Sequence, residues 1–207
     1  MRQRNPRGEG SKLANDIVAG AAAIVERTGT DEAVTLRSVA REVGIAAPSI
    51  YAHFADRDAI LWGLVGRVFD DLRVQVGAVL DGYDDPVDRL VAGCEGYVAY
   101  GLDNPALYRV LFARQFPEED APAEGLPVGG EAFGLLVEAI ERCVAAGRSV
   151  STDPFADATA VWVALHGMVS LWSTVCDFPW PEDRHRFVTR LVLPLAQVPV
   201  SSTGGRG

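Results

Sequence analysis

The chain has 207 residues, of which 48% are hydrophobic and 23% are charged. This composition excludes a disordered or low-complexity protein and predicts a folded globular protein with a substantial core. The three cysteines, Cys94, Cys143 and Cys176, are odd in number, far apart and set in apolar patterns, which favours buried free thiols over disulfides or a metal cluster. Without an apolar run of ~20 residues or a secretory signal, we expect a cytoplasmic protein with no membrane partner.

The charge is unevenly distributed along the chain. The net charge of −9 argues against a nucleic-acid binder, but residues 1–65 hold eight Lys/Arg and eight Asp/Glu, and the remainder holds eleven against twenty. The first residues form a basic arm with Arg2, Arg4, Arg7 and Lys12. A neutral N-terminal unit on an acidic body is compatible with phosphate contact at one end. The arm could enter a minor groove or be a solvated terminus without a fixed role.

Apolar residues at helical spacing dominate the first third of the chain and predict four helices. After a first helix, Thr35 is placed to cap a short second helix. A short third helix has Pro48 in its first turn, and Asp56 caps a long helix over 56–81.

Three later helix starts consist of a capping residue followed by proline. Asp85, Asn104 and Asp153 each precede a proline, and we expect helices near 86–102, 105–114 and 154–176. A Pro/Gly/acid-rich loop at 117–130, a helix through Phe133 and Val144, and a last helix near 181–197 complete the chain. With no strand pattern, the expected fold class is all-α, with about nine helices in an N-terminal three-helix head and a larger C-terminal bundle.

Residues 35–54 have the layout of a helix-turn-helix, with "TLRSVAREV", the turn "GIAA" and a second helix "PSIYAHF". Ala40 leaves room for the crossing, Gly44 tolerates a positive φ in the turn, and Ile45 and Ile50 can fill the space between the helices. The outer side of the second helix is small and polar, and so could lie in a major groove. This side consists of Ala46, Ala47, Ser49, Tyr51, Ala52 and His53.

Several polar side chains around this motif can donate hydrogen bonds to phosphates. Because the outer side holds three alanines, sequence specificity is expected to rest on methyl contacts, Arg37, Ser49 and DNA shape. A three-helix structural unit that never meets DNA is the alternative. The candidate DNA-binding residues are Thr35, Leu36, Arg37, Ala46, Ala47, Pro48, Ser49, Tyr51, His53 and Arg57.

The stretch "TLRSVAREVGIAAPSIYAHFADRDAIL" resembles the DNA-binding region of the TetR family of transcriptional regulators. The resemblance covers roughly residues 12–65 and includes the Thr-x-Arg opening, Pro-Ser-Ile-Tyr and the x-His-Phe ending. The family usually has lysine where Arg57 stands, and arginine keeps the charge. "WVALHG", with Trp162, His166 and Gly167, looks like the Trp-His-Gly (WHG) class of TetR C-terminal domains.

The resemblance implies an all-α homodimer whose C-terminal domain binds a small molecule. Binding of this effector would release a repressor from a palindromic operator in double-stranded DNA. The implied division is a flexible basic arm (1–11), a DNA-binding domain (12–56), a ligand-binding and dimerisation domain (57–198) and a disordered tail (199–207). The last two helices would form a four-helix interface with their copies. The alternative is a small all-α ligand-binding or catalytic protein whose helix-turn-helix unit is only structural.

An aromatic set in the C-terminal part could line the effector pocket or be ordinary core. No catalytic constellation, metal-ligand spacing or cofactor motif is found in the sequence, because its three histidines lie on separate elements and no nucleophile has a matching base. The candidate pocket residues are Tyr97, Tyr100, Tyr108, Phe112, Phe133, Trp162, His166 and Met168.

Overall fold

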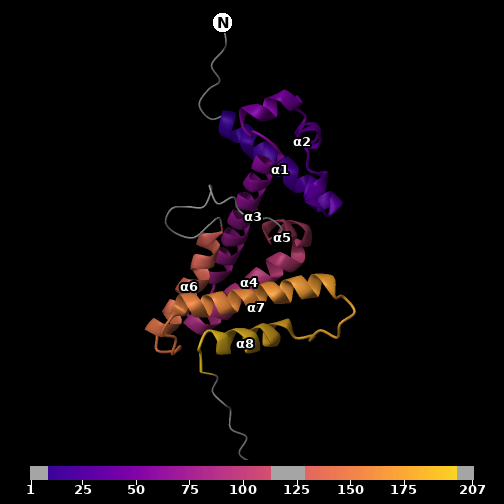
Figure 1. The fold of residues 1–207 in the computed structure, drawn as a ribbon. Helices are drawn as coiled ribbons and strands as arrows, with labels where there is room; N and C mark the ends of the chain where they lie inside the picture. The colour runs from indigo at the N-terminus through magenta and orange to yellow at the C-terminus, as the bar shows by residue number, and fades with distance from the viewer. Residues whose placement is uncertain (1–8, 113–128, 200–207) are drawn as a thin grey trace, which may run out of the picture. The chain divides into compact units, whose positions relative to one another are not determined.

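The computed structural model describes residues 9–112 and 129–199, and these ranges form helices and no strand (Figure 1). This confirms the expected all-α fold. Most of the basic arm and of the 117–130 loop, and the tail from residue 200, lie outside the described residues. The α-helices are α1 (Glu9–Thr28), α2 (Leu36–Val43), α3 (Arg57–Leu80), α4 (Pro86–Asp103), α5 (Pro105–Phe112), α6 (Gly130–Ala145), α7 (Pro154–Thr174) and α8 (Arg184–Leu195), with two short 3-10 helices, η1 (Asp31–Ala33) and η2 (Ala47–Ala52).

The described residues form two compact units. The first unit consists of residues 9–69 and 104–112, so α5 packs with α1 although it follows α4 in the chain. The second unit consists of residues 70–103 and 129–199 and holds the end of α3 together with α4, α6, α7 and α8.

The helix starts follow the capping residues that the sequence indicates. Side-chain oxygens of Thr35, Asp56, Asp85 and Asp153 accept backbone N–H bonds of 2.8–3.1 Å from the first turns of α2, α3, α4 and α7. Each bond satisfies a donor that a helix N-terminus leaves without an intrahelical partner. These local signals therefore fix where the helices begin.

In the second unit, α4 packs against α6, α7 and α8, and α7 also packs against α6 and α8. Figure 1 shows α7 and α8 side by side and antiparallel. By length and composition α7 could span a membrane; in this unit it packs against α4, α6 and α8, with Val161, Leu165 and Val169 buried. Its outward side still exposes Val163 and Leu171, at 60% and 51%.

Candidate nucleic-acid interface

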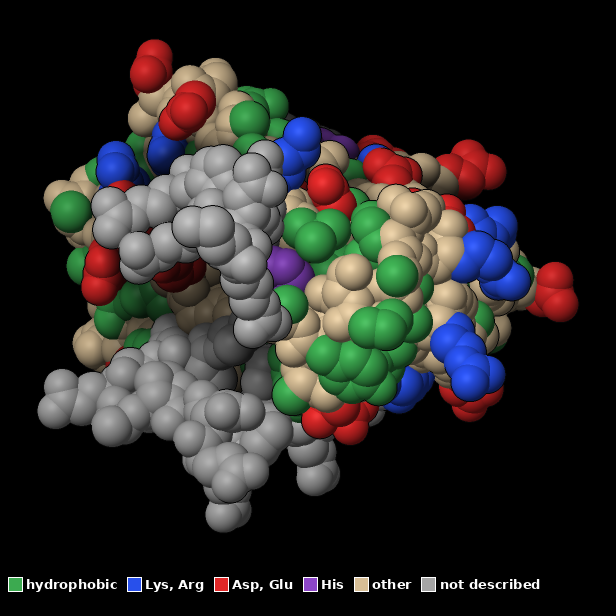
Figure 2. Space-filling view, turned by 90° about the horizontal axis from the view of Figure 1, so that it is seen from above, with side chains coloured by type: hydrophobic (Ala, Val, Ile, Leu, Met, Phe, Trp, Pro, Cys, Tyr) green, Lys and Arg blue, Asp and Glu red, His purple; other side chains and the backbone are tan. Residues whose placement is uncertain are grey.

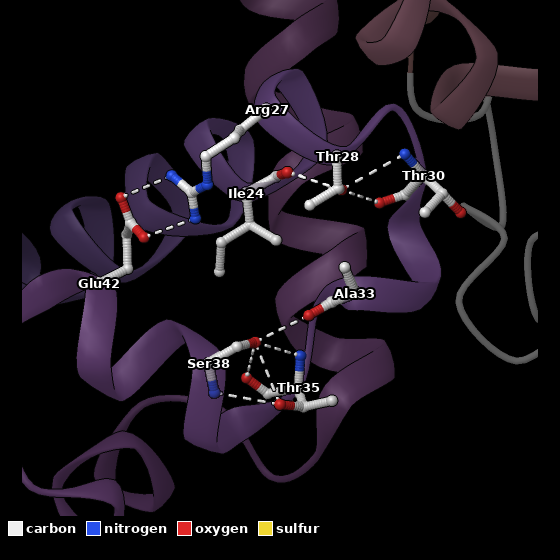
Figure 3. A network of polar contacts seen from close by, with 8 residues as sticks. All are labelled: Ile24, Arg27, Thr28, Thr30, Ala33, Thr35, Ser38 and Glu42. Carbon is white, nitrogen blue, oxygen red and sulfur yellow. Dashed lines mark hydrogen bonds and ion pairs between the residues drawn. The ribbon is translucent and has the colours of Figure 1, made fainter.

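The first unit holds α2 firmly against α1. Gly20 of α1 allows the close approach, because a Cβ there would lie 2.7 Å from the Cγ2 atom of Val43. Across the same contact, Arg27 donates two hydrogen bonds to the carboxylate of Glu42, at 3.2 and 2.8 Å (Figure 3). The hydrogen bond from Arg27 lowers the pKa of Glu42. α1 is thus the support on which the helix-turn-helix is built.

The start of α2 is fixed by a capping box (Figure 3). The backbone N–H of Ser38 donates to Oγ1 of Thr35 at 3.0 Å, and the backbone N–H of Thr35 donates to Oγ of Ser38 at 2.8 Å. The Ser38 hydroxyl also lies 2.8 Å from the carbonyl oxygen of Ala33, to which it can donate. Reciprocal capping of this kind sets the direction in which the helix leaves the preceding loop.

The turn after α2 depends on Gly44, as the sequence predicts. Its φ of 74° and ψ of 30° lie in the left-handed region, and no heavy atom lies within 4 Å of the position of a Cβ. Glycine is therefore required by backbone conformation and not by space. The turn brings Ile50 into the core with no exposed surface, while Ile45 is half-buried.

The second element of the motif is a 3-10 helix, η2, and not the expected helix over 48–54. Its bonds span three residues, from Ser49 N–H to the Ala46 carbonyl and from His53 N–H to the Ile50 carbonyl, both at 2.8 Å. A six-residue segment with Pro48, which has no N–H to donate, offers few i→i−4 bonds and tightens into 3-10 geometry.

Most of the predicted DNA-binding residues lie on two consecutive elements that pack against each other, the start of α2 and η2. Tyr51 stands out because 63% of this large aromatic side chain is exposed. Thr35, Arg37, Ala46, Pro48 and Ser49 are also exposed, and Leu36, Ala47 and His53 are partly exposed.

Arg57, at the start of α3, points back into the first unit. Its Nε donates to the Val34 carbonyl and its Nη2 to the Asp31 carbonyl, both at 2.7 Å. Sequence reasoning placed this residue with the phosphate contacts and missed these partners, which lie 23 and 26 residues away in the chain.

Arg41 is a further exposed cation that sequence reasoning did not single out. It lies one helical turn after Arg37 on α2, and both residues are exposed. The spacing of four residues, which places side chains on one helix face, is the signal that could have identified it.

Lys and Arg side chains do not form one continuous patch on the face drawn in Figure 2. Lys and Arg side chains there lie among acidic and apolar ones. Along the sequence, residues 1–65 hold eight Lys/Arg and eight Asp/Glu, so the charge of this part of the chain is balanced.

In the second unit, part of the aromatic set comes together between α6 and α7. Ring centroids of Phe133 and Trp162 are 6.1 Å apart, and those of Trp162 and His166 are 6.4 Å apart. Phe155 adds a contact of 5.3 Å to Phe133. Burial lowers the pKa of His166, so the neutral imidazole is favoured.

The other candidate pocket residues lie elsewhere or are deeply buried. The rings of Tyr108 and Phe112 on α5 are tilted against each other with centroids 5.1 Å apart in the first unit, where the Phe112 ring also lies 6.3 Å from that of Phe69. Tyr100 and Met168 are 4% and 5% exposed. Tyr97 on α4 is partly exposed.

No set of three or more metal-ligating side chains comes together within the described ranges. A hollow of about 340 Å³ at the start of α8 is lined by Pro181, Glu182, Asp183, Arg186, Phe187 and Arg190. Neither observation points to a reaction centre in this part of the chain.

Comparisons with known proteins agree with this site. Rv1816 from Mycobacterium tuberculosis, an HTH-type transcriptional regulator, is 26% identical over 129 residues, which is 59% of this chain and 54% of that protein. The nucleoid occlusion factor SlmA of Vibrio campbellii is 27% identical over 105 residues, 49% of this chain and 54% of that protein. The chain thus spans about half the length of the curated relatives it matches.

The fold is similar to that of RolR in its complex with resorcinol, with a TM-score of 0.67, 14% identity and coverage of 94% of this chain and 92% of that one. Likeness at this identity shows the fold alone. Two family models match, one for bacterial regulatory proteins of the tetR family over residues 17–62 and one for the tetracyclin repressor-like C-terminal domain over residues 90–195. The family and fold are those of transcriptional regulators and not of enzymes, and the chain belongs to the TetR family of bacterial regulatory proteins.

Proposed function

We propose that this protein is a cytoplasmic, DNA-binding transcriptional repressor that leaves a palindromic operator when it binds a small molecule. DNA binding is supported above all by the exposed Tyr51 on η2. The turn and the helix that precede η2 are fixed by Gly44 and by the capping box of Thr35. The large amphipathic ring of Tyr51 lies at the surface of η2. A ring in this position can contact the phosphates that line a groove of DNA. The contact set is Thr35, Leu36, Arg37, Ala46, Ala47, Pro48, Ser49, Tyr51 and His53.

Paired substitutions test this proposal. Tyr51→Phe with His53→Ala is expected to weaken operator binding about tenfold, because two hydrogen bonds to phosphates are lost. Tyr83→Phe is the matched control, since Tyr83 is also exposed, at 45%, but follows α3 in the second unit. Equal affinities of both variants for the operator would contradict the phosphate roles.

For the effector, we propose a pocket in the second unit that includes Phe133, Trp162 and His166, together with Tyr97, Tyr100 and Met168. The ring contacts between α6 and α7 support an aromatic lining, and a neutral His166 can donate or accept a hydrogen bond from a polar ligand. We also assign the C-terminal part to the WHG class, on the basis of Trp162, His166 and Gly167 on α7.

Small phenols are the first probes for this pocket, since resorcinol is the ligand in the similar RolR structure. Wild-type protein is expected to show saturable quenching of tryptophan fluorescence, and Trp162→Leu is expected to abolish it. Trp180→Phe is the control, because Trp180 stacks with Trp172 and Phe178 away from the proposed lining. Quenching that survives in Trp162→Leu would exclude this lining.

A homodimer through α7 and α8 is the proposed assembly. The exposed Val163 and Leu171 on α7 support it, because large apolar side chains on one helix of a soluble bundle favour a protein partner. Val163→Asp is expected to give a monomer in light scattering, and an unchanged mass would contradict this interface.

A further inference from the structure

Arg57 makes an unusually complete set of contacts for a side chain that is one-third exposed. Nε donates to the Val34 carbonyl and Nη2 to the Asp31 carbonyl, both at 2.7 Å, and Nη2 also lies 3.3 Å from Oδ2 of Asp31. The Nη1 atom lies 3.6 Å from the carboxylate of Asp58. The N–H donors and the positive charge of the guanidinium are therefore used by carbonyls and carboxylates of the protein itself.

The carbonyls that receive these bonds belong to the segment between α1 and α2. Asp31 begins η1, and Val34, which has no exposed surface, is the last residue before the N-cap Thr35. The Asp31 carbonyl also accepts the backbone N–H of Val34 at 3.0 Å. Arg57 is the first residue of α3, and its bonds hold residues 31–34, the segment that sets the orientation of α2.

Lysine could not make the same set of contacts. An ammonium group has three donors on a single nitrogen, so it lacks the planar fork whose Nε and Nη2 reach two different carbonyls at once. The geometry therefore separates two roles of a cation at this position: charge alone suits a phosphate, and the fork suits the two carbonyls and the carboxylate of the η1 segment.

We propose that Arg57 is a positioning residue for DNA binding, which fixes the η1–α2 segment and does not contact the phosphate backbone. This inference rests on the proposed DNA-binding function. In this proposal Arg57 strengthens DNA binding by preorganisation and not by direct contact with phosphate. The DNA-binding head binds tightly because α2 is already held in its binding orientation.

The test compares Arg57→Lys and Arg57→Gln with Arg37→Lys and Arg37→Gln, since Arg37 is an exposed arginine of the proposed contact set. At position 57, lysine and glutamine are expected to weaken operator binding equally, by about tenfold. At position 37, lysine is expected to bind like the wild type, whereas glutamine lowers the salt slope of binding by about one. The proposal would be overturned if Arg57→Lys bound the operator with wild-type affinity and Arg57→Gln lowered the salt slope of binding.

Amide hydrogen exchange on the DNA-free protein gives a readout that does not depend on DNA. Arg57→Lys is expected to speed exchange of the Val34 and Ser38 amides at least severalfold, because both report on the held segment. Arg37→Lys is expected to leave these rates unchanged. Unchanged rates in Arg57→Lys would contradict the positioning role, whereas wild-type protein that binds no operator would contradict the proposed function and leave the exchange result valid.

Discussion

Arg109 of α5 donates a hydrogen bond of 2.8 Å from Nη2 to the carbonyl of Gly29, the residue that follows α1. Eighty positions separate the two residues in the chain, and both belong to the first unit. Gly29 has a φ of 75°, so the end of α1 is a left-handed turn whose carbonyl is held by α5. The unit that holds the helix-turn-helix therefore includes α5, a helix from the middle of the sequence.

This relationship predicts that Arg109→Gln loosens the end of α1. Loss of one exposed hydrogen bond is expected to lower stability by about 1 kcal/mol and to speed exchange of the Gly29 amide, which donates to the Val25 carbonyl at 2.8 Å. Arg190→Gln, on exposed α8 surface of the second unit, serves as control. Equal exchange rates at Gly29 in both variants would show that α5 does not restrain α1.

Gly44→Ala should destabilise the protein through backbone conformation alone. A left-handed alanine costs about 1–2 kcal/mol, and the added methyl meets no atom within 4 Å. Gly66→Ala is a control of opposite sign, because Gly66 lies inside α3, has equally open space and should gain about 0.5–1 kcal/mol. Urea denaturation measures both. A neutral Gly44→Ala would mean that the turn relaxes without strain.

His166 predicts a pH dependence of stability. Burial lowers its pKa in the folded state, so below about pH 6.5 the unfolded chain takes up a proton first. Stability is therefore expected to fall as the pH drops from about 6.5 to the lowered pKa, and to be independent of this group above that window. The difference in Tm between wild type and His166→Gln isolates this contribution. A difference that stays constant from about pH 5 to 7.5 would argue against it.

The three thiols should differ in reactivity. Burial raises the pKa of Cys94 to about 12 and that of Cys143 to about 11, whereas Cys176 is exposed. Because the thiolate is the nucleophile, an aromatic disulfide reagent at about pH 8 is expected to label only Cys176 in the folded protein, and all three after unfolding. Rapid labelling of a folded Cys176→Ser variant would contradict the buried positions. The sequence interpretation expected all three thiols to be buried, and Cys176 corrects it.

The sequence determined the features that depend on neighbouring residues. Thr35, Asp85 and Asp153 cap helices as expected, and Gly44 has its left-handed conformation, because caps and turns are local interactions. The family motif then identified the head.

The features that the sequence did not reveal depend on distant partners. Arg57 was assigned to phosphates because its charge is visible in the sequence, whereas the carbonyls that it contacts carry no residue signature. Gly20 was passed over for a similar reason: its role appears only when α1 lies against Val43 of α2. The 3-10 form of η2 depends on the shortness of the segment and on Pro48, which together leave few i→i−4 bonds, and helical periodicity in the sequence does not distinguish the two forms.

Selection of operators from random double-stranded DNA tests the central claim most directly. At moderate salt, the purified wild-type protein is expected to enrich palindromes whose half-sites lie about one helical turn, ~34 Å, apart, as two heads of a dimer require. The enrichment should fall in the double variant Tyr51→Phe with His53→Ala, which is expected to bind about tenfold more weakly, and persist with Tyr83→Phe. A wild-type protein that enriches no palindrome would contradict the proposal and leave the helix-turn-helix as a structural unit.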